Sequence, residues 1–362
     1  MASAKKQLKQ LFEAIDRTYW GPEERALVAQ AVALAVETGD EKLEYQARMR
    51  QTASANMVGD TDTVLSSFAW CLAKHDADPR RFPRDIENGA ADLMWQFKWM
   101  GGTLQRSTAF SQAQIDAVLN DMESHYRAEG LGMSGVLTAR FEGAWDAGRF
   151  DEAEALRVQL EATERDSHSH CDACGRSQLA GYFAEVGREA DTIRLVDEML
   201  EGGFQCGEEP EHALSRALVP HLRAGQFENA RHLHLRSYRM AKDNPDNLGI
   251  IANHLVFCAI TGNEARGLSL VERHIGWLAH DGLNDRGQFH ALAAIGLVLD
   301  AVARTGHGDA VVRGADAQEL ERFFGAHDGA WTADELAAAA WARAAGIATA
   351  FDERNGTTAF TD

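Results

Sequence analysis

A glycine-centred turn recurs through the middle of the chain at nearly constant spacing. The turns are AGRFDEAEAL from Ala147, VGREADTIRL from Val186, AGQFENARHL from Ala224 and TGNEARGLSL from Thr261. Successive turn glycines are separated by 39, 38 and 37 residues. Five positions after each glycine stands a small or short residue, and eight positions after it stands leucine: Ala153, Thr192, Ala230 and Gly267, and Leu156, Leu195, Leu233 and Leu270. This period restricts the chain to a repetitive fold.

Each period has the pattern of one helical hairpin. Apolar residues recur at helical spacing on both sides of the turn, only six prolines occur, and alternating strand patterns are almost absent. The small residue permits close approach of the two helices, and the leucine fills the seam between them. Because one hairpin cannot bury its apolar face alone, neighbouring hairpins must stack. We therefore expect an all-α solenoid of antiparallel helix pairs.

The hairpin pattern resembles that of the tetratricopeptide-repeat (TPR) family. The best match is Leu179, Ala180 and Phe183 before Gly187, together with GRFDEAEAL after Gly148. The resemblance covers residues 20–304 and implies a right-handed α-solenoid that binds a protein or peptide. The chain departs from the family in its period of 37 to 39 residues instead of about 34, and in its missing or displaced closing proline, as at Pro245.

The repeat pattern weakens toward both ends of the chain. Residues 1–19 predict a separate N-terminal helix, and residues 20–304 form the predicted repeat array. Within the array, RDIENGAADLMWQFKWM and SQAQIDAVLNDMESHYRAEG predict a less regular helix pair, the second with Ser111 as its N-cap. Residues 305–362 lose the period, and TADELAAAAWARAAGIATAF predicts a capping helix there.

The charge of the chain limits its partners. Its 362 residues include 55 acidic and 36 basic ones, a formal net charge of −19. Nucleic-acid backbones and anionic membranes would be repelled at long range. We therefore expect a protein or peptide partner, no nucleic acid and no membrane.

The N-terminal sequence and the cysteines indicate a reducing cellular compartment. MASAKKQLKQLFEAIDRTYW meets Glu13 and Asp16 before a signal peptide can form, and we find no apolar run of about 18 residues. The five cysteines are too few for a disulfide scaffold. We expect a cytoplasmic protein. Arginine outnumbers lysine 29 to 7, which is typical of a GC-rich, bacterial coding sequence.

The stretch DSHSHCDACGRS, residues 166–177, contains the strongest candidate for a binding site. Cys171 and Cys174 form a C-x-x-C pair, whose spacing suits two ligands of one tetrahedral ion. Cys206 follows the next hairpin, and antiparallel helices of similar length should return it to the same edge. His212 opens the following helix at that edge. These four residues predict a structural Zn²⁺ site, with His170 or His168 as alternative fourth ligand.

Two other interpretations of the cysteines stay open. The thiols can be incidental to a turn, or they can form a redox pair, although the βαβ context of thioredoxin-like motifs is missing. Four protein ligands would close the coordination shell, as in structural rather than catalytic zinc sites. The TPR pattern contains no such site, so the resemblance lends it no support.

No catalytic motif occurs in its required structural context. GLGMSG, residues 130–135, fits G-x-G-x-x-G but follows a predicted helix instead of a strand, so we interpret it as a turn. We find no H-E-x-x-H, G-x-S-x-G or phosphate-binding loop. We expect a binding scaffold and no enzyme. The alternatives are a regulatory sensor whose array responds to a peptide or to metal loss, and an enzyme with an unrecognised site.

The TPR resemblance also implies where a partner binds. In that family the first helix of each hairpin lines the concave face, here residues 174–186, 211–224 and 247–261. The inward positions ten and two residues before Gly187 and Gly225 are Ser177, Glu185, Ser215 and Arg223. We expect these four to contact the partner; the alternative is a solvated helix surface.

Overall fold

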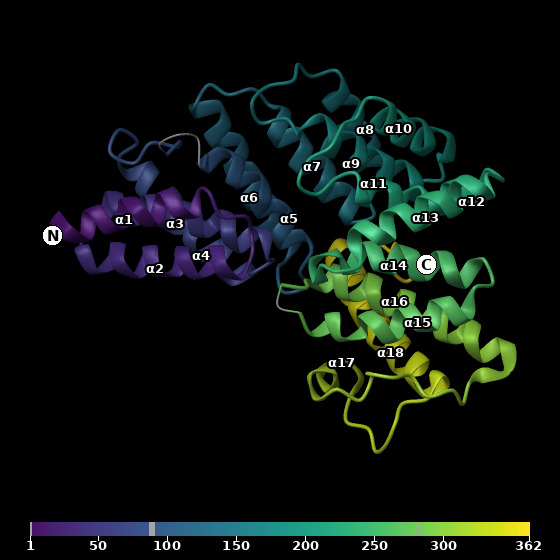
Figure 1. Cartoon of the computed structure of the whole chain (residues 1–362). Coiled ribbons are helices and arrows are strands. Elements are labelled where there is room, and N and C mark those ends of the chain that lie inside the picture. The colour runs from purple at the N-terminus through teal and green to yellow at the C-terminus, as the bar shows by residue number, and fades with distance from the viewer. Residues whose placement is uncertain (1, 87–90, 281) are drawn as a thin grey trace. The chain divides into compact units, whose positions relative to one another are not determined.

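A computed structural model describes residues 2–86, 91–280 and 282–362, and these are helical nearly throughout (Figure 1). Within those ranges there is no β-strand, only the isolated bridges Asp85–Asp92 and Val311–Thr332. The predicted all-α class is confirmed. The chain divides into two compact units, one of residues 1–146 and 151–169 and the other of residues 147–150 and 170–362.

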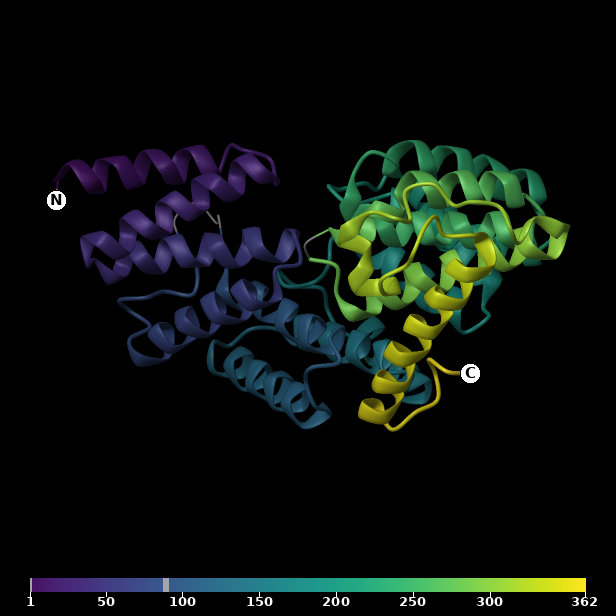
Figure 2. The same cartoon turned by 90° about the horizontal axis from the view of Figure 1, so that it is seen from below.

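The first unit is a succession of antiparallel helices, most of which pack on the next helix of the chain (Figure 2). They are α1 (Ala2–Ile15), α2 (Pro22–Thr38), α3 (Glu41–Met57), α4 (Thr61–Ala77), α5 (Leu93–Gln105), α6 (Gln112–Ala128), α7 (Ser134–Asp146) and most of α8 (Phe150–Glu161). Ser111 caps α6 through a capping box, as predicted. Helix α5 begins only at Leu93, because the Asp92 carboxylate accepts the N–H groups of Met94 and Trp95. Residues 87–90 of that predicted helix lie outside the described residues.

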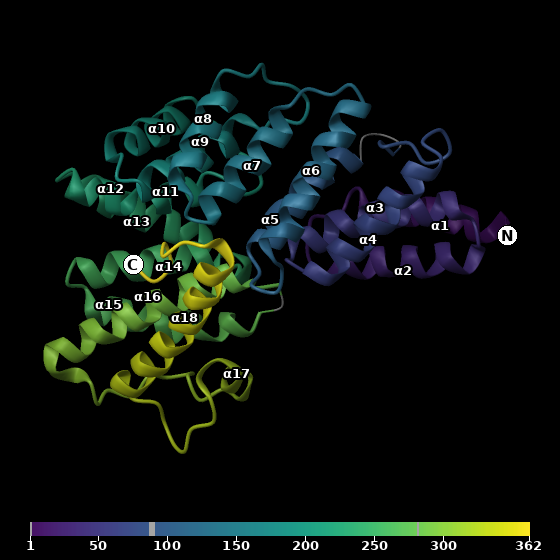
Figure 3. The same ribbon diagram turned by 180° about the vertical axis from the view of Figure 1, so that it is seen from behind.

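The second unit holds the most regular repeats. Its helices are α9 (Asp172–Glu185), α10 (Glu189–Glu201), α11 (Glu211–Arg216), α12 (Leu218–Arg223), α13 (Phe227–Ala241), α14 (Leu248–Ile260), α15 (Glu264–His274), α16 (Asp285–Val302), α17 (Glu321–Phe324) and α18 (Ala333–Asn355). Figure 3 shows α9, α11 and α14 in succession, followed by α16 and α18. The first helices of the hairpins therefore stack on one another, as the period predicts.

The repeated turn positions have the conformation that their residue types require. Gly148, Gly187, Gly225 and Gly262 have φ angles of 73°, 74°, 73° and 68°, a left-handed region that other residues rarely adopt. The small residues five positions later are buried. At Gly267, an added Cβ would lie 2.9 Å from a methyl carbon of Val298. The small residue thus permits close helix approach, as predicted.

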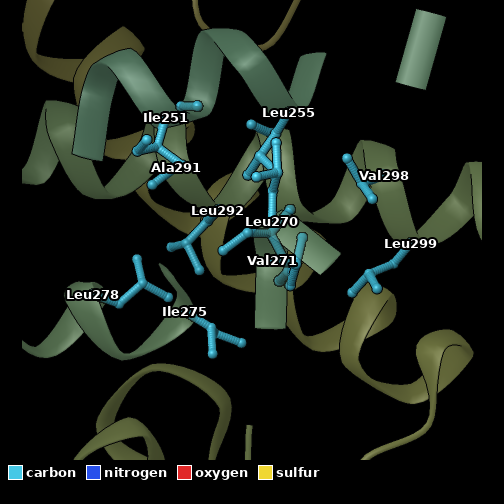
Figure 4. Packing of buried hydrophobic residues seen from close by; sticks show 14 of the residues in the cluster. Ile251, Leu255, Leu270, Val271, Ile275, Leu278, Ala291, Leu292, Val298 and Leu299 are labelled. Carbon is cyan, nitrogen blue, oxygen red and sulfur yellow. The ribbon is translucent and has the colours of Figure 1, made fainter. Parts of the chain in front are cut away.

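Helix α16 is central to the core of the second unit. It packs on α14, α15 and α18, and Figure 4 shows Leu292, Val298 and Leu299 beside Leu255 and Leu270. Among the described residues, Asp285–His307 is the one helical stretch long and apolar enough to cross a membrane, with a mean hydropathy of 1.3. The expectation of no apolar run of about 18 residues is therefore corrected for this helix. Half of it is buried inside the protein, which accounts for its apolar composition.

The C-terminal residues close the second unit. A helix, α18, lies where the capping helix is predicted; it starts with a capping box of Thr332 and Glu335 and packs on α16. After α18 the tail folds back, and the Asp352 carboxylate accepts the N–H groups of Phe360 and Thr361. The Thr357 hydroxyl donates to the carbonyl oxygen of Ala147 at 3.2 Å, 210 residues earlier in the chain.

Candidate metal centre

Three cysteine thiols meet at one end of the α9–α10 hairpin. The sulfur atoms of Cys171, Cys174 and Cys206 all lie within 4.8 Å of one another, and those of Cys174 and Cys206 are 3.4 Å apart. All three residues belong to the second unit. The hairpin returns Cys206 to the C-x-x-C pair, which is the arrangement that the antiparallel geometry predicts.

The local backbone directs N–H groups at the sulfur atoms. Cys171 is the N-cap of α9, and its sulfur accepts the N–H of Cys174 at 3.3 Å. Cys206 lies in the α10–α11 connection, and its sulfur accepts the N–H of Glu208 at 3.5 Å. N–H donation favours the thiolate form, as does the N-terminal end of a helix for Cys171. Hydrogen bonds from such backbone donors would help to orient thiolates around a metal ion.

The cluster cannot easily carry three negative charges by itself. Burial raises the pKa of the Cys171 thiol, but hydrogen bonds from Cys174, Ala173 and Cys206 outweigh it and hold the pKa below its ordinary value. Burial raises the pKa of the Cys174 thiol, and the neighbouring thiols raise it further. A cation among the sulfurs would relieve this repulsion, because metal binding and thiol deprotonation are coupled. The three cysteines could therefore hold a metal ion, one that accepts soft sulfur ligands.

His212 lies at the start of α11, close in the chain to the cluster. Its Nδ1 is 2.8 Å from the carbonyl oxygen of Glu208, the residue whose N–H contacts the Cys206 sulfur. A carbonyl only accepts, so Nδ1 carries the proton and Nε2 of the neutral ring keeps its lone pair. This is the tautomer of a histidine that binds a metal through Nε2. The atoms close enough together to share a metal ion are the three cysteine sulfurs, and no atom of His212 is among them. For His212 to bind the same ion, its ring must turn toward the sulfurs.

The two alternative histidines differ in their surroundings. His170 is half-buried in the second unit, with Nε2 3.4 Å from the Gln178 amide nitrogen. His168 belongs to the first unit and is buried there. Its Nε2 is 3.5 Å from Asp92 and its Nδ1 is 3.1 Å from the Ser167 hydroxyl. Both ring nitrogens of His168 thus have polar neighbours within the first unit, whereas the three cysteines belong to the second.

The second unit has a groove along the outer side of α10. It has a volume of about 820 Å³ and is lined by Glu189, Ala190, Ile193, Arg194, Asp197, Glu198, Glu201, Arg223, Ala224 and Gln226. Arg223, a predicted contact residue, lines this groove and lies 3.3 Å from Glu189. Most of the lining comes from a second helix of a hairpin, whereas the TPR resemblance implied first helices.

Two of the four predicted contact residues are not accessible. Ser177 is 1% exposed and Ser215 is 3% exposed, so the expectation that they face a partner is wrong for this conformation. Arg216 donates to the Ser177 hydroxyl, and the Asn253 amide donates to the Ser215 hydroxyl. Stacking of the next hairpin covers both positions. Glu185 is exposed and lies 3.9 Å from Arg286 of α16.

A buried histidine cluster escaped the sequence analysis. His234, His254 and His274 lie on α13, α14 and α15, spaced by 20 residues, and each is at most 7% exposed. The Nδ1 atoms of His234 and His254 are 2.9 Å apart. The Ser237 hydroxyl donates its one proton to the Glu211 carbonyl, so it accepts a hydrogen bond from Nε2–H of His254. In a neutral ring the other nitrogen of His254, Nδ1, then has no proton. It therefore accepts the hydrogen bond that His234 Nδ1–H donates. The even spacing was visible in the sequence, but nothing in it indicated burial.

No protein-family model matches the chain, and a search of curated proteins finds no match.

Proposed function

We propose that this chain is a TPR-like scaffold that binds a protein or peptide, with a structural Zn²⁺ ion at Cys171, Cys174 and Cys206. The observation that carries the binding role is the groove of about 820 Å³ along α10, since grooves on stacked helical hairpins suit extended or helical peptides. Its lining mixes apolar side chains, such as Ile193, with charged ones, such as Glu189 and Arg194. That composition is common in peptide sites.

Zinc is the metal that best fits the proposed site. Three thiolates and one imidazole form a common tetrahedral structural site for Zn²⁺. In this proposal His212 supplies the fourth ligand once its ring turns toward the sulfurs; its contact with the Glu208 carbonyl favours the tautomer whose Nε2 can bind the ion. Reduced cysteines are consistent with the proposed cytoplasmic location.

The proposed ion supports the groove directly. Glu198 and Glu201 line the groove from the last turns of α10, and Cys206 follows that helix by five residues. Zinc bound to Cys206 would hold this end of α10 against the start of α9. Cys171 and Cys206 are both exposed, so solvent reaches the site. This exposure favours a second candidate, a sensor in which metal loss loosens α10 and changes the groove.

Site-specific crosslinking tests the binding role. A photoreactive amino acid at Ala190, which is exposed in the groove, should capture one defined protein in the native cell. The same amino acid at Val158, an exposed apolar position on α8, is the control. Ile193→Glu should abolish the Ala190 crosslink while far-UV circular dichroism and zinc content stay unchanged. Identical products from both positions would reject the groove as the binding site.

A further inference from the structure

The exposed face of α13 concentrates apolar side chains that lack a covering element. Phe227 is 66% exposed, Leu235 51% and Met240 43%. These are three of the ten large hydrophobic residues exposed among the described residues, and they lie on one helix of 15 residues. The opposite face of α13 is buried against the unit through Ala230, Leu233 and Tyr238. Phe227, Leu235 and Met240 are thus not among the residues by which α13 packs against the unit.

Arginines alternate with these apolar residues at helical spacing. Phe227, Arg231, Leu235 and Arg239 follow one another at intervals of four, and so form one stripe along the helix. His232, Arg236 and Met240 form a parallel stripe with the same interval. All seven residues are exposed. The surface is therefore both apolar and basic along the length of α13.

Much of this positive charge is not neutralised within the chain. Within the described part of the chain, Arg236 and Arg239 have no ion-pair partner. Arg231 lies 3.7 Å from Glu228, and exposed pairs of this kind contribute little. Arg266 of α15 adds a further charge at the edge, where its guanidinium lies 4.9 Å from the centre of the Tyr238 ring. In a chain of net charge −19, this face has the opposite sign from the whole.

We propose that the exposed face of α13 is a docking surface for an acidic, amphipathic helical segment of a partner protein. Carboxylates of such a segment would pair with Arg231, Arg236 and Arg239, and its apolar side chains would cover Phe227 and Leu235. Those two residues are eight positions apart, about 12 Å along the helix, which spans two turns of an opposing helix. Local charge complementarity selects the acidic segment, whereas the acidic remainder of the chain repels polyanions.

This surface is separate from the α10 groove in its chemistry. The groove carries more acidic than basic residues, while the α13 face is basic. The surface also makes no use of the cysteine cluster. A variant can therefore affect one surface and leave the other intact.

Fluorescence anisotropy with designed peptides tests the proposal. The probe is a labelled helical peptide with leucine on one face and glutamate on the flanking positions; the comparison peptide has lysine in place of every glutamate, and a single-stranded RNA of similar charge is the third probe. The acidic peptide should bind the full-length protein, and added salt should weaken the binding. Arg236→Glu with Arg239→Glu should raise its Kd at least tenfold, as should Phe227→Ser with Leu235→Ser.

The control is a double charge reversal elsewhere, Arg304→Glu with Arg343→Glu. This variant also replaces two arginines by glutamates, so its net charge changes by the same amount. Both arginines are exposed, like those of α13. Ile193→Glu in the groove should leave peptide binding unchanged, which separates this surface from the proposed function. Circular dichroism must show unchanged helix content in each variant. The proposal is overturned by equal loss in the control variant, by preferred binding of the lysine peptide or the RNA, or by self-association of the chain through α13.

Discussion

The sulfur of Cys206 lies 3.4 Å from the sulfur of Cys174, although 32 residues separate them in the sequence. The intervening residues form one helical hairpin, and its two helices are of nearly equal length, α9 with 14 residues and α10 with 13. The equality brings the end of the second helix back to the start of the first. A ligand set can therefore form from residues that the repeat itself positions.

Removal of one thiol should remove the metal. We expect one Zn²⁺ per chain in protein purified without chelator, and less than a tenth of that in Cys174→Ser or Cys206→Ser, because two thiolates cannot complete the site. Zinc-binding free energies in small domains are on the order of 10 kcal/mol, so the melting temperature should fall as well. Elemental analysis and calorimetry measure both effects. Cys71→Ala, at a buried cysteine of the first unit, should keep its zinc. A metal-free wild-type protein would contradict the prediction.

The fourth ligand can be identified by cobalt substitution. Co²⁺ bound by three thiolates and one imidazole gives visible absorption bands that report its ligands and tetrahedral geometry. His212→Ala should shift these bands and weaken metal affinity by more than the roughly 10- to 100-fold that follows loss of a residue supporting a ligand, because a direct ligand is lost. His170→Ala should leave the spectrum as it is in the wild type. The reverse result would assign the fourth position to His170.

Acid should destabilise the second unit through its buried histidines. Burial, together with the charge of Arg266, lowers the pKa of His234 to about 4, and burial and nearby cations lower that of His254 to about 3. An unfolded histidine has a pKa of about 6.5, so below that pH the unfolded chain binds more protons than the folded one. Stability is therefore complete above pH 6.5 and declines as the pH falls toward 4, by on the order of 3 kcal/mol per histidine.

Urea unfolding between pH 7.5 and pH 4.5 measures this decline. Cys174→Ser is the suitable background, because proton competition for metal ligands then makes no contribution. His234→Leu in that background should flatten the pH dependence, whatever its effect on stability at pH 7.5. An unchanged slope would mean that these histidines do not control acid sensitivity.

Close packing at Gly267 should make α15 sensitive to a single methyl group. An added Cβ would lie 2.9 Å from a Val298 methyl carbon and 3.4 Å from the Cys258 Cβ, so Gly267→Ala should lower the free energy of unfolding by about 1 to 3 kcal/mol. Gly249 in α14 is the matched control, since its added Cβ meets nothing within 4 Å. Gly249→Ala should be neutral or stabilising. Equal effects of both substitutions in chemical denaturation would contradict this packing.

The features that local geometry determines were predictable from the sequence. The turn glycines, the buried small residues and the meeting of three cysteines all follow from one period and from the residue types at fixed positions. The family resemblance placed Ser177 and Ser215 on an exposed face. It could not predict that Arg216 and Asn253, on neighbouring helices, would hydrogen-bond to these two hydroxyls. The division of the chain near residue 170 left no signal, because helical spacing continues on both sides of it. The sequence shows the apolar and basic residues of α13 at intervals of four. Whether they are exposed depends on which helices pack against α13, and the sequence does not show that.

The hydrogen bond from Thr357 to the Ala147 carbonyl also bears on how the protein is made. The first unit consists of residues 1–146 and 151–169, so a ribosome has synthesised all of these residues well before it reaches Thr357. The second unit includes residues 147–150, and another 207 residues, 151–357, are synthesised before Thr357 can bond to Ala147. Nascent chains arrested before Thr357 would thus contain every residue of the first unit, but their second unit would lack the hydrogen bond from Thr357 to Ala147.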